Sequence, residues 1–351
     1  MGNSGLFDLL EALAPSGREV AGQQRWIGMV SKWVDRVDSD VHGNAWGVLE
    51  GRGGRLCSIL LEAHVDEIGW IVRHVDEKGF LWLVPIGGSD PQIASGRHII
   101  FEGKDGPVSG VVGAVSMGLL EKGGGDPPRR NGVFADIGAE SALAVEKMGL
   151  RVGSSGVFSC EASRMSGGRI TGRGLDNRAG GYVLARTLQI LAKSQRRPVA
   201  TVWAANCVQE EIGLRGAQMV AHRLRPDLAV VVDVTSATDV PGLDGREHGR
   251  ILLGAGPVLG HGGANHPVLV ERLAALARRL GIPAQERATP GATRTDADVV
   301  VSSRSGIPCA LLSIPLRNMH SPVEVVDGRD LESLASLLAG FVLSLRGNPF
   351  D

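Results

Sequence analysis

Short apolar runs that end in a carboxylate or an imidazole constrain this chain more than any other feature. Six such side chains lie just past an apolar run or at the expected start of a helix: His64, Asp176, Glu210, Glu211, Asp233 and His320. In an open α/β sheet the loops at the strand ends converge, so residues distant in sequence can meet there. The pattern predicts an α/β fold with one composite site, and its residue types favour a pair of metal ions.

The order of the expected elements indicates two domains. With 351 residues, the chain exceeds the usual size of one hydrophobic core. Helix-like and strand-like patterns alternate in residues 1–67 and 163–351, which favours a mostly parallel sheet flanked by helices. Residues 68–162 contain short β-branched runs and many glycines, so we expect a smaller β-rich domain inserted into the first.

Hydrophobic periodicity and turn residues predict the individual elements. We expect helices at residues 4–14, 18–34, 139–149, 177–193, 267–280 and 331–345. We expect strands at residues 55–63, 68–74, 80–86, 108–115, 199–208, 228–232 and 309–314. Residues 121–128 and 256–263 are expected to form loops, and Asp38, Asp40 and His42 a turn.

Charge and hydropathy exclude several classes of partner. The net charge is −1 and the basic residues are dispersed, so we expect no nucleic-acid partner. No apolar run reaches the ~18 residues of a membrane span, and the first residues do not resemble a signal peptide. We therefore expect no membrane partner and a cytoplasmic location. The four cysteines show no paired spacing, which fits a reducing compartment.

Asp66, two residues after His64, makes His64 a stronger candidate for a metal ligand. An isolated histidine is more often structural than a ligand. A carboxylate two residues later can accept a hydrogen bond from the second imidazole nitrogen and fix the ring, as the outer partners of metal-bound histidines do. The pair favours a metal ligand, although this spacing alone is a weak motif.

Glu210 and Glu211 follow an apolar run directly, and two adjacent carboxylates in a dry cleft would repel each other. A cation would relieve that repulsion. If Glu211 binds the metal, Glu210 can take a proton from a metal-bound water as a general base. The alternative is a solvated helix start, where acidic residues suit the helix dipole.

The remaining three candidates are ambiguous when taken singly. Asp233 ends an apolar run, where a buried carboxylate needs a cation or donors. Asp176 precedes an expected helix, and an isolated aspartate there is more often an N-cap than a metal ligand. His320 follows the last expected strand after a short linker.

Taken together, these residues have the composition of a dinuclear site. Two divalent cations would be balanced by Asp176, Glu211 and Asp233 with a bridging hydroxide, which suits hydrolysis near neutral pH. Mixed nitrogen and oxygen ligands favour zinc, with cobalt and manganese as alternatives.

At these residues the chain resembles the tetrahedral (TET-type) aminopeptidases, a family that includes glutamyl aminopeptidases and proteins named endoglucanases. The resemblance covers nearly the whole chain. Its matching segments are residues 40–44, 63–69, 136–139, 175–178, 209–213, 233–235, 295–297 and 319–324.

The resemblance implies a role for each site residue. One metal would be held by His64 and Asp233 and the other by Glu211 and His320, with Asp176 bridging both. Glu210 would be the general base, and Asp66 would steady His64. It also implies a cis Asp176–Asn177 peptide bond, short peptide substrates, and a β-rich domain that assembles dimers into a hollow dodecamer.

Four positions depart from the family pattern or add uncertainty about the substrate pocket. Ser89 stands where tryptophan is common, Asn318 where tyrosine is usual and Arg294 where glycine is frequent, and His261 lies near the expected pocket. These departures leave every proposed ligand in place. We assign no chemistry to His74, His98, His222 or His248.

Three functions remain in view. The ligand set favours an aminopeptidase that removes N-terminal residues from short peptides. A glycoside hydrolase is the alternative suggested by the endoglucanase names, but glycosidases use two free carboxyl groups and need no metal pair. A non-catalytic assembly subunit would be free to lose ligands, and none is lost here.

Overall fold

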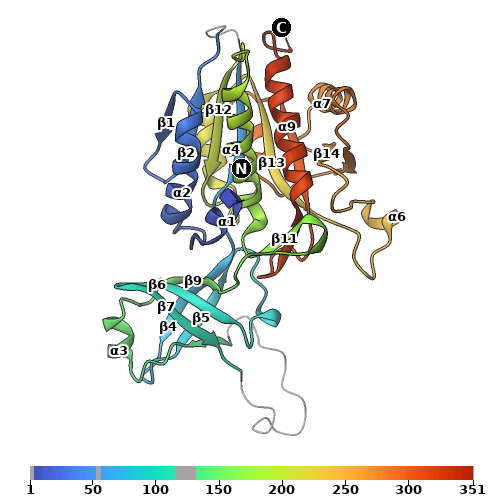
Figure 1. Ribbon diagram of the computed structural model, residues 1–351. Helices are drawn as coiled ribbons and strands as arrows, with labels where there is room; N and C mark the ends of the chain where they lie inside the picture. The colour runs from blue at the N-terminus through green and yellow to red at the C-terminus, as the bar shows by residue number, and fades with distance from the viewer. Residues whose placement is uncertain (1–3, 53–56, 115–131, 351) are drawn as a thin grey trace.

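A large β-sheet flanked by helices forms the main body of the computed structural model, which describes residues 4–52, 57–114 and 132–350 (Figure 1). In these residues the sheet has the strand order β1-β2-β12-β3-β13-β16-β14-β15. Strands β12, β3, β13 and β16 run parallel, whereas β2 pairs antiparallel with β12, and β14 antiparallel with β16. The mostly parallel α/β fold predicted from the sequence is confirmed.

The strands of this sheet are β1 (Arg36–Ser39), β2 (Ala45–Leu49), β3 (Ser58–His64), β12 (Thr201–Cys207), β13 (Leu228–Ser236), β14 (Val258–His261), β15 (Gln285–Ala288) and β16 (Cys309–Leu316). The α-helices are α1 (Ser4–Leu10), α2 (Val20–Val30), α3 (Ala142–Lys147), α4 (Leu175–Lys193), α5 (Arg215–Leu224), α6 (Gly245–His248), α7 (Pro267–Leu280), α8 (Ala297–Val301) and α9 (Gly328–Ser344). Short 3-10 turns are η1 (Ser31–Trp33), η2 (Pro91–Ile93) and η4 (Ser166–Gly168).

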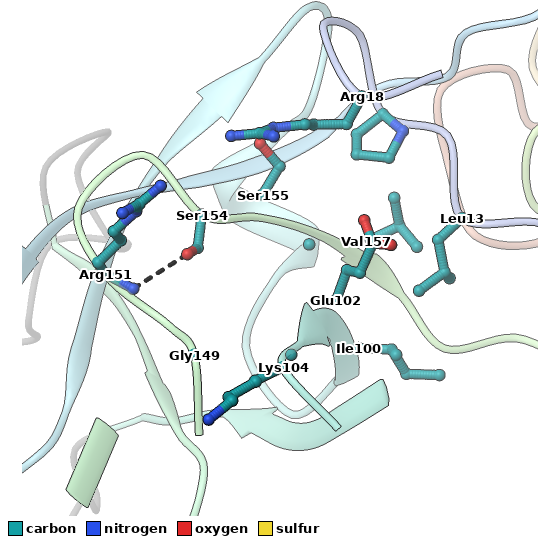
Figure 2. A pocket seen from close by; sticks show the side chains of 13 residues that line it. Leu13, Arg18, Ile100, Glu102, Lys104, Gly149, Arg151, Ser154, Ser155 and Val157 are labelled. Carbon is teal, nitrogen blue, oxygen red and sulfur yellow. Dashed lines mark hydrogen bonds between the residues drawn. The ribbon is translucent and has the colours of Figure 1, made fainter. Parts of the chain in front are cut away.

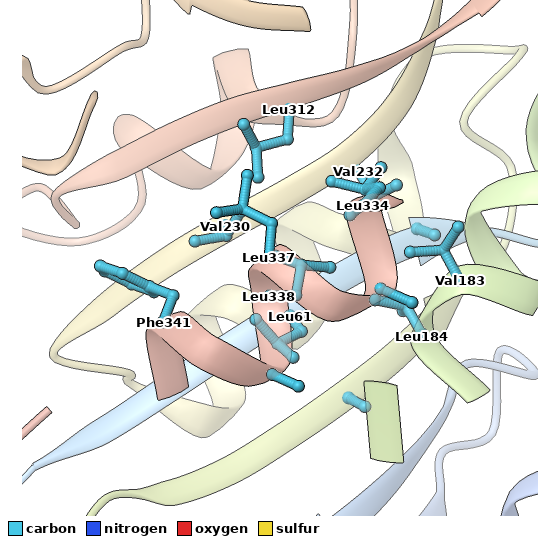
Figure 3. Packing of buried hydrophobic residues seen from close by; sticks show 14 of the residues in the cluster. Leu61, Val183, Leu184, Val230, Val232, Leu312, Leu334, Leu337, Leu338 and Phe341 are labelled. Carbon is cyan, nitrogen blue, oxygen red and sulfur yellow. The ribbon is translucent and has the colours of Figure 1, made fainter. Parts of the chain in front are cut away.

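Helices cover both faces of the sheet, which explains the nearly continuous apolar sequences of its central strands. Helices α4 and α9 pack together over β3, β13 and β16. Figure 3 shows this layer, in which Val183, Leu334 and Phe341 meet strand residues such as Leu61 and Val230. Helices α5 and α8 cover the opposite face.

The second body is a closed antiparallel barrel with the strand order β4-β5-β8-β7-β6-β9, at the lower end of Figure 1. Its strands are β4 (Gly69–Val75), β5 (Leu81–Ile86), β6 (His98–Gly103), β7 (Gly106–Val112), β8 (Val133–Asp136) and β9 (Ser155–Phe158). Trp70, Leu83 and Phe101 are fully buried in its core. The expected loop at residues 121–128 lies outside the described residues.

The chain re-enters the main body through a small antiparallel sheet of β10 (Ser163–Arg164), β11 (Arg169–Gly172) and β17 (Glu324–Asp327). Strand β17 leads directly into α9, and β11 leads into α4. This sheet therefore joins the end of the barrel excursion to the two long helices of the main body. In the described residues, no helix combines the length and apolar character needed to cross a membrane.

Three local predictions were wrong in instructive ways. The first helix ends at Leu10 rather than at residue 14, because Ala14 bonds Glu67 through both its backbone N–H and its carbonyl. Residues 258–261 form strand β14 instead of a loop, since they pair with β15 and β16. Asp38 lies in strand β1 rather than in a turn.

Candidate metal centre

The fold gathers all six predicted site residues at the carboxyl end of the parallel strands. His64 is the last residue of β3 and lies in register with Cys207, the last residue of β12. Glu210 and Glu211 follow β12, and His320 follows β16. Asp233 lies inside β13 rather than at its tip, because pairing with β16 extends that strand to Ser236.

Asp176 occupies the centre of the group. Its Oδ1 lies 3.3 Å from His64 Nε2, and its Oδ2 lies 3.4 Å from His320 Nε2. The two oxygens of one carboxylate thus face two imidazoles that are 256 residues apart in the sequence. Asp176 is positioned by the start of α4, where its backbone N–H donates to Glu324 Oε2 at 3.2 Å.

The other donors complete two sets around Asp176. Asp233 Oδ1 lies 3.7 Å from His64 Nε2, and Glu211 Oε2 lies 3.6 Å from His320 Nε2. Glu210 Oε2 is 3.9 Å from His64 Nε2. Two ligands on one tetrahedral zinc ion are roughly 3.3 Å apart, so the spacing and donor types fit two divalent cations.

The electrostatics of the group favour the binding of positive charge. Burial raises the pKa of Glu210 to about 9, and the charge of Asp233 adds to that rise. Burial and the charge of Asp176 raise the pKa of Glu211 well above its usual range. The carboxyl groups cannot all be ionised at neutral pH without cations, whereas bound cations would favour their charged forms.

Asp66 organises the loop that carries Glu210 and Glu211. Its Oδ1 accepts the N–H of Glu210 at 3.0 Å, and its Oδ2 accepts the N–H of Glu211 at 3.2 Å and the hydroxyl of Ser16 at 2.6 Å. The backbone carbonyl of Asp66 lies 3.2 Å from His64 Nδ1. If Nδ1 donates this bond, Nε2 is left free to face the site.

Glu67 and two arginines form a neutralised cluster that the sequence analysis missed. Arg173 Nη1 lies 2.6 Å from both carboxylate oxygens of Glu67, and Arg178 Nη2 lies 2.6 Å from Oε1. All three side chains are buried. The sequence signals that could have identified it are the acidic residue directly after Asp66 and the two arginines on either side of Asp176.

Three further acidic residues beside the site were given no role in the sequence analysis. Glu324 accepts the N–H groups of both Asp176 and His320, at 3.2 and 3.0 Å, and so fixes the backbones of two candidate ligands. Glu62 and Asp296 are fully buried, and their carboxyl oxygens have no hydrogen-bond partner among the described residues. Position two residues before His64 was the only sequence clue to Glu62.

Asn177 fixes the turn at the start of α4. Its Nδ2 donates to the carbonyl of Val232 at 2.7 Å, and its Oδ1 accepts the N–H of Gly180 at 3.0 Å. The Asp176–Asn177 peptide bond is cis, as the family resemblance implied. Asn177 thereby ties the bridging candidate Asp176 to strand β13.

The barrel touches the candidate centre through the segment after β5. A Cβ atom at Gly88 would overlap the imidazole of His320, so glycine is required for this close approach. The neighbouring Ser89 is buried and donates to the carbonyl of Gly69 at 2.8 Å. Ser89 therefore joins the segment after β5 to the first residue of β4.

A separate cavity of about 400 Å³ lies between the N-terminal segment and the barrel (Figure 2). Arg18 lines it from one side, and Glu102, Lys104 and Arg151 from the barrel. Neither of the two His and carboxylate clusters found in the described residues contributes to it. The candidate catalytic site is instead a different cavity, which is lined by Asp176, Glu210, Glu211, Asp233 and His320.

The histidines to which we assigned no chemistry lie away from this group. His74 and His98 belong to barrel strands, and His222 and His248 to the short helices α5 and α6. His261 lies at the end of β14 with Nε2 3.8 Å from Glu286 Oε2, outside the residues that line the site cavity.

Comparison with known proteins settles the family. A profile of the M42 glutamyl aminopeptidase family matches residues 43–337. The chain belongs to this family. Membership makes it a peptide hydrolase of the aminopeptidase type, and M42 peptidases are metallopeptidases.

Relatives match over almost the full chain. It is 33% identical to the lysyl aminopeptidase of Pyrococcus furiosus, over 98% of this chain and 96% of that protein. An aminopeptidase structure from Desulfurococcus kamchatkensis has a TM-score of 0.90 at 34% identity, covering 97% of this chain and 94% of that one. The TET1 peptidase of Pyrococcus horikoshii, which can assemble into a tetrahedron or a large octahedral shell, has a TM-score of 0.87 at 27% identity, covering 98% of this chain and all of that one.

Proposed function

We propose that this aminopeptidase works with two divalent cations, one held by His64 and Asp233 and the other by Glu211 and His320, with Asp176 shared between them. The observation that carries the proposal is the placement of Asp176, whose two oxygens face the two imidazoles at 3.3 and 3.4 Å. Zinc suits this donor set best, and cobalt and manganese are alternatives.

When bound, the cations would polarise the scissile carbonyl and make water nucleophilic near neutral pH. Glu210 would accept the proton of the attacking water and return it to the leaving amine. Its carboxyl group borders the cavity and lies 3.9 Å from the candidate ligand His64. Asp66 would act as a positioning residue, because it holds the backbone of Glu210 and Glu211.

The variant Glu210→Gln tests the mechanism directly. Metal content should remain near two per chain, while turnover of short peptides falls by about 10²–10⁴-fold because the general base is lost. Glu271→Gln, an exposed change on α7, is the matched control and should retain both metal and activity. Unchanged turnover in Glu210→Gln would remove Glu210 from this role.

The glycosidase alternative is disfavoured by the same geometry. A glycosidase needs two carboxyl groups free to flank a sugar. Asp176, Glu211 and Asp233 instead each lie within 3.3–3.7 Å of an imidazole nitrogen. Chelator-sensitive release of amino acids from peptides, with no reducing sugar from β-glucan, supports the peptidase. The opposite pattern would support the glycosidase.

The non-catalytic alternative predicts a site that does not work. Purified protein that binds no metal and shows no peptidase activity after addition of zinc, cobalt or manganese would favour it. Every proposed ligand is present and close to its partners, which supports a working site.

We also propose that residues 68–162 form the assembly domain of a dodecamer, while residues 1–67 and 163–351 form the catalytic domain. Support comes from the separate core of the barrel and from the shells formed by the TET1 peptidase of Pyrococcus horikoshii. Light scattering should give twelve chains of 36.9 kDa each. A monomer at assay concentration would contradict the assembly without affecting the metal site.

A further inference from the structure

The cavity between the N-terminal segment and the barrel has no role in the proposed function. Leu13, Pro15 and Arg18 line it from the loop between α1 and α2, and the rest of its lining comes from β6, β9 and the loops beside them. Its volume of about 400 Å³ lies in the usual range for small-ligand sites. It is large enough for a small organic molecule.

Positive charge exceeds negative charge in the lining of this cavity. Three basic side chains, Arg18, Lys104 and Arg151, contribute to it, and Glu102 is the one acidic side chain among its described lining residues. Within the described part of the chain, the charged groups of these four residues form no ion pair and no hydrogen bond. The lining therefore has a net charge of +2 that an anionic ligand would balance.

Two serine hydroxyls add hydrogen-bond donors to the lining. Ser154 Oγ accepts the backbone N–H of Arg151 at 3.0 Å, which leaves its O–H to donate to a ligand. Ser155 follows it as the first residue of β9, and Figure 2 shows both serines among the side chains that line the cavity. Guanidinium, ammonium and hydroxyl donors together are the groups that bind phosphate oxygens.

Another part of the lining is apolar. Leu13, Ile100 and Val157 lie together at the right of Figure 2, whereas Lys104 and Arg151 lie at the left. A bare phosphate ion would fill only a fraction of the cavity and would leave this apolar surface uncovered. A ligand that carries an apolar body next to its phosphate group would match both parts.

The segment that carries Arg18 is tied to the candidate metal centre. The hydroxyl of Ser16 donates to Asp66 Oδ2 at 2.6 Å. Asp66 in turn accepts the backbone N–H groups of Glu210 and Glu211. A ligand that held this segment against the barrel would therefore also restrain the loop that carries the proposed general base.

We propose that this cavity binds a small organic phosphate and that its binding activates the peptidase. Arg18, Lys104 and Arg151 hold the phosphate group, and the apolar body lies against Leu13 and Ile100. Arg18 comes from the main body and the other two basic residues from the barrel domain, so the ligand bridges the two. The binding is independent of the proposed function, whereas the activation rests on it.

Calorimetry with the metal-loaded protein and phenyl phosphate tests the binding. Inorganic phosphate and benzyl alcohol serve as probes of the charge and of the apolar body alone. Phenyl phosphate should bind about tenfold or more tightly than inorganic phosphate, because it also buries its ring, and benzyl alcohol should show no measurable binding.

Variants locate the bound phosphate. In Arg18→Gln and Arg151→Gln the affinity for phenyl phosphate should fall by about 10–100-fold, because each variant loses a charge-assisted hydrogen bond. Lys147→Gln is the control, since Lys147 is exposed on α3 of the same domain and does not line the cavity. Phosphate groups also bind metal ions, so unchanged affinity in both arginine variants would place the ligand elsewhere and overturn the proposal.

Steady-state kinetics on a panel of aminoacyl p-nitroanilides test the activation. Saturating phenyl phosphate should raise kcat by about twofold or more in the wild type and in Lys147→Gln, because the loop with the general base is held in place. At the same concentration the two arginine variants should show no increase. Competitive inhibition of equal strength in all four proteins, or an unchanged kcat in a wild type that binds the ligand, would overturn the activation. Absence of cleavage of every substrate would instead defeat the proposed function and leave the binding result standing.

Discussion

Two clusters of buried charge have interleaved positions in the sequence, and they differ in which groups balance their carboxylates. Glu67 is matched by Arg173 and Arg178 at 2.6 Å. Among the residues that the structure describes, the ion-pair partners of Asp176, Glu210, Glu211 and Asp233 are the two imidazoles of His64 and His320. A buried carboxylate is costly unless it is paired. The chain supplies that pairing in the first cluster, and we infer that metal ions supply it in the second.

The largest expected effect comes from removing the shared ligand. Asp176→Asn should lower both metal content and peptide turnover, the latter by at least about 10³-fold, because both proposed cation sites lose a charged donor. The protein should remain folded. Metal analysis and kcat/KM measure the effect, with the exposed Asp8→Asn on α1 as control. If Asp176→Asn kept two metals and full activity, metal ions would not be what balances the carboxylates around Asp176.

The matched cluster should respond in stability instead of metal binding. Glu67→Gln leaves Arg173 and Arg178 buried without their carboxylate, which should lower the free energy of unfolding by about 3–5 kcal/mol. Metal content of the folded variant should stay near the wild-type level. Denaturant unfolding measures the loss, and the exposed Glu146→Gln on α3 is the control. If the variant lost metal but kept its stability, the two clusters would have been assigned the wrong roles.

The smallest effect is a difference in pH dependence after removal of metal by a chelator. Burial would raise the pKa of Glu67, but the charges of Arg173 and Arg178 lower it below 4.5 overall. Its stabilising contribution is therefore present above pH 4.5 and is lost as pH falls through the lowered pKa. Burial raises the pKa of Glu210 to about 9, so its contribution is present below pH 4.5 and is lost as pH rises towards 9.

Unfolding of the metal-free wild type, Glu67→Gln and Glu210→Gln over this pH range separates the two signs. The difference between wild type and Glu67→Gln should shrink in acid. The difference between wild type and Glu210→Gln should grow in alkali. The same pH slope for both differences would show that the clusters are electrostatically alike.

The sequence was informative where chemistry and strand ends coincide. His64 ends an apolar strand, and Glu210 and His320 each follow one, so their convergence could be predicted from the α/β pattern. Helix α7 begins and ends where its periodicity indicated, at Pro267 and Leu280. A buried strand and a capped helix have strong local signals.

Features that depend on tertiary pairing were not predictable in the same way. Strand β14 was taken for a loop because its four residues, Val258–His261, form a strand only through their neighbours β15 and β16. The pairing of Glu67 with Arg173 and Arg178 spans more than a hundred residues. Arg294 was noted as a departure from its family, but only the fold brings it to the same cavity as Arg287.

The contact between Gly88 and His320 links the two bodies of the molecule at the candidate metal centre. The barrel is the part of the chain to which we assign assembly, and one of its loops lies directly against a proposed metal ligand. Neighbouring copies that press on the barrel would therefore influence how firmly His320 holds its ion. If the chain forms the proposed assembly, its dissociation would weaken binding of the cation proposed at Glu211 and His320 before that of the cation proposed at His64 and Asp233.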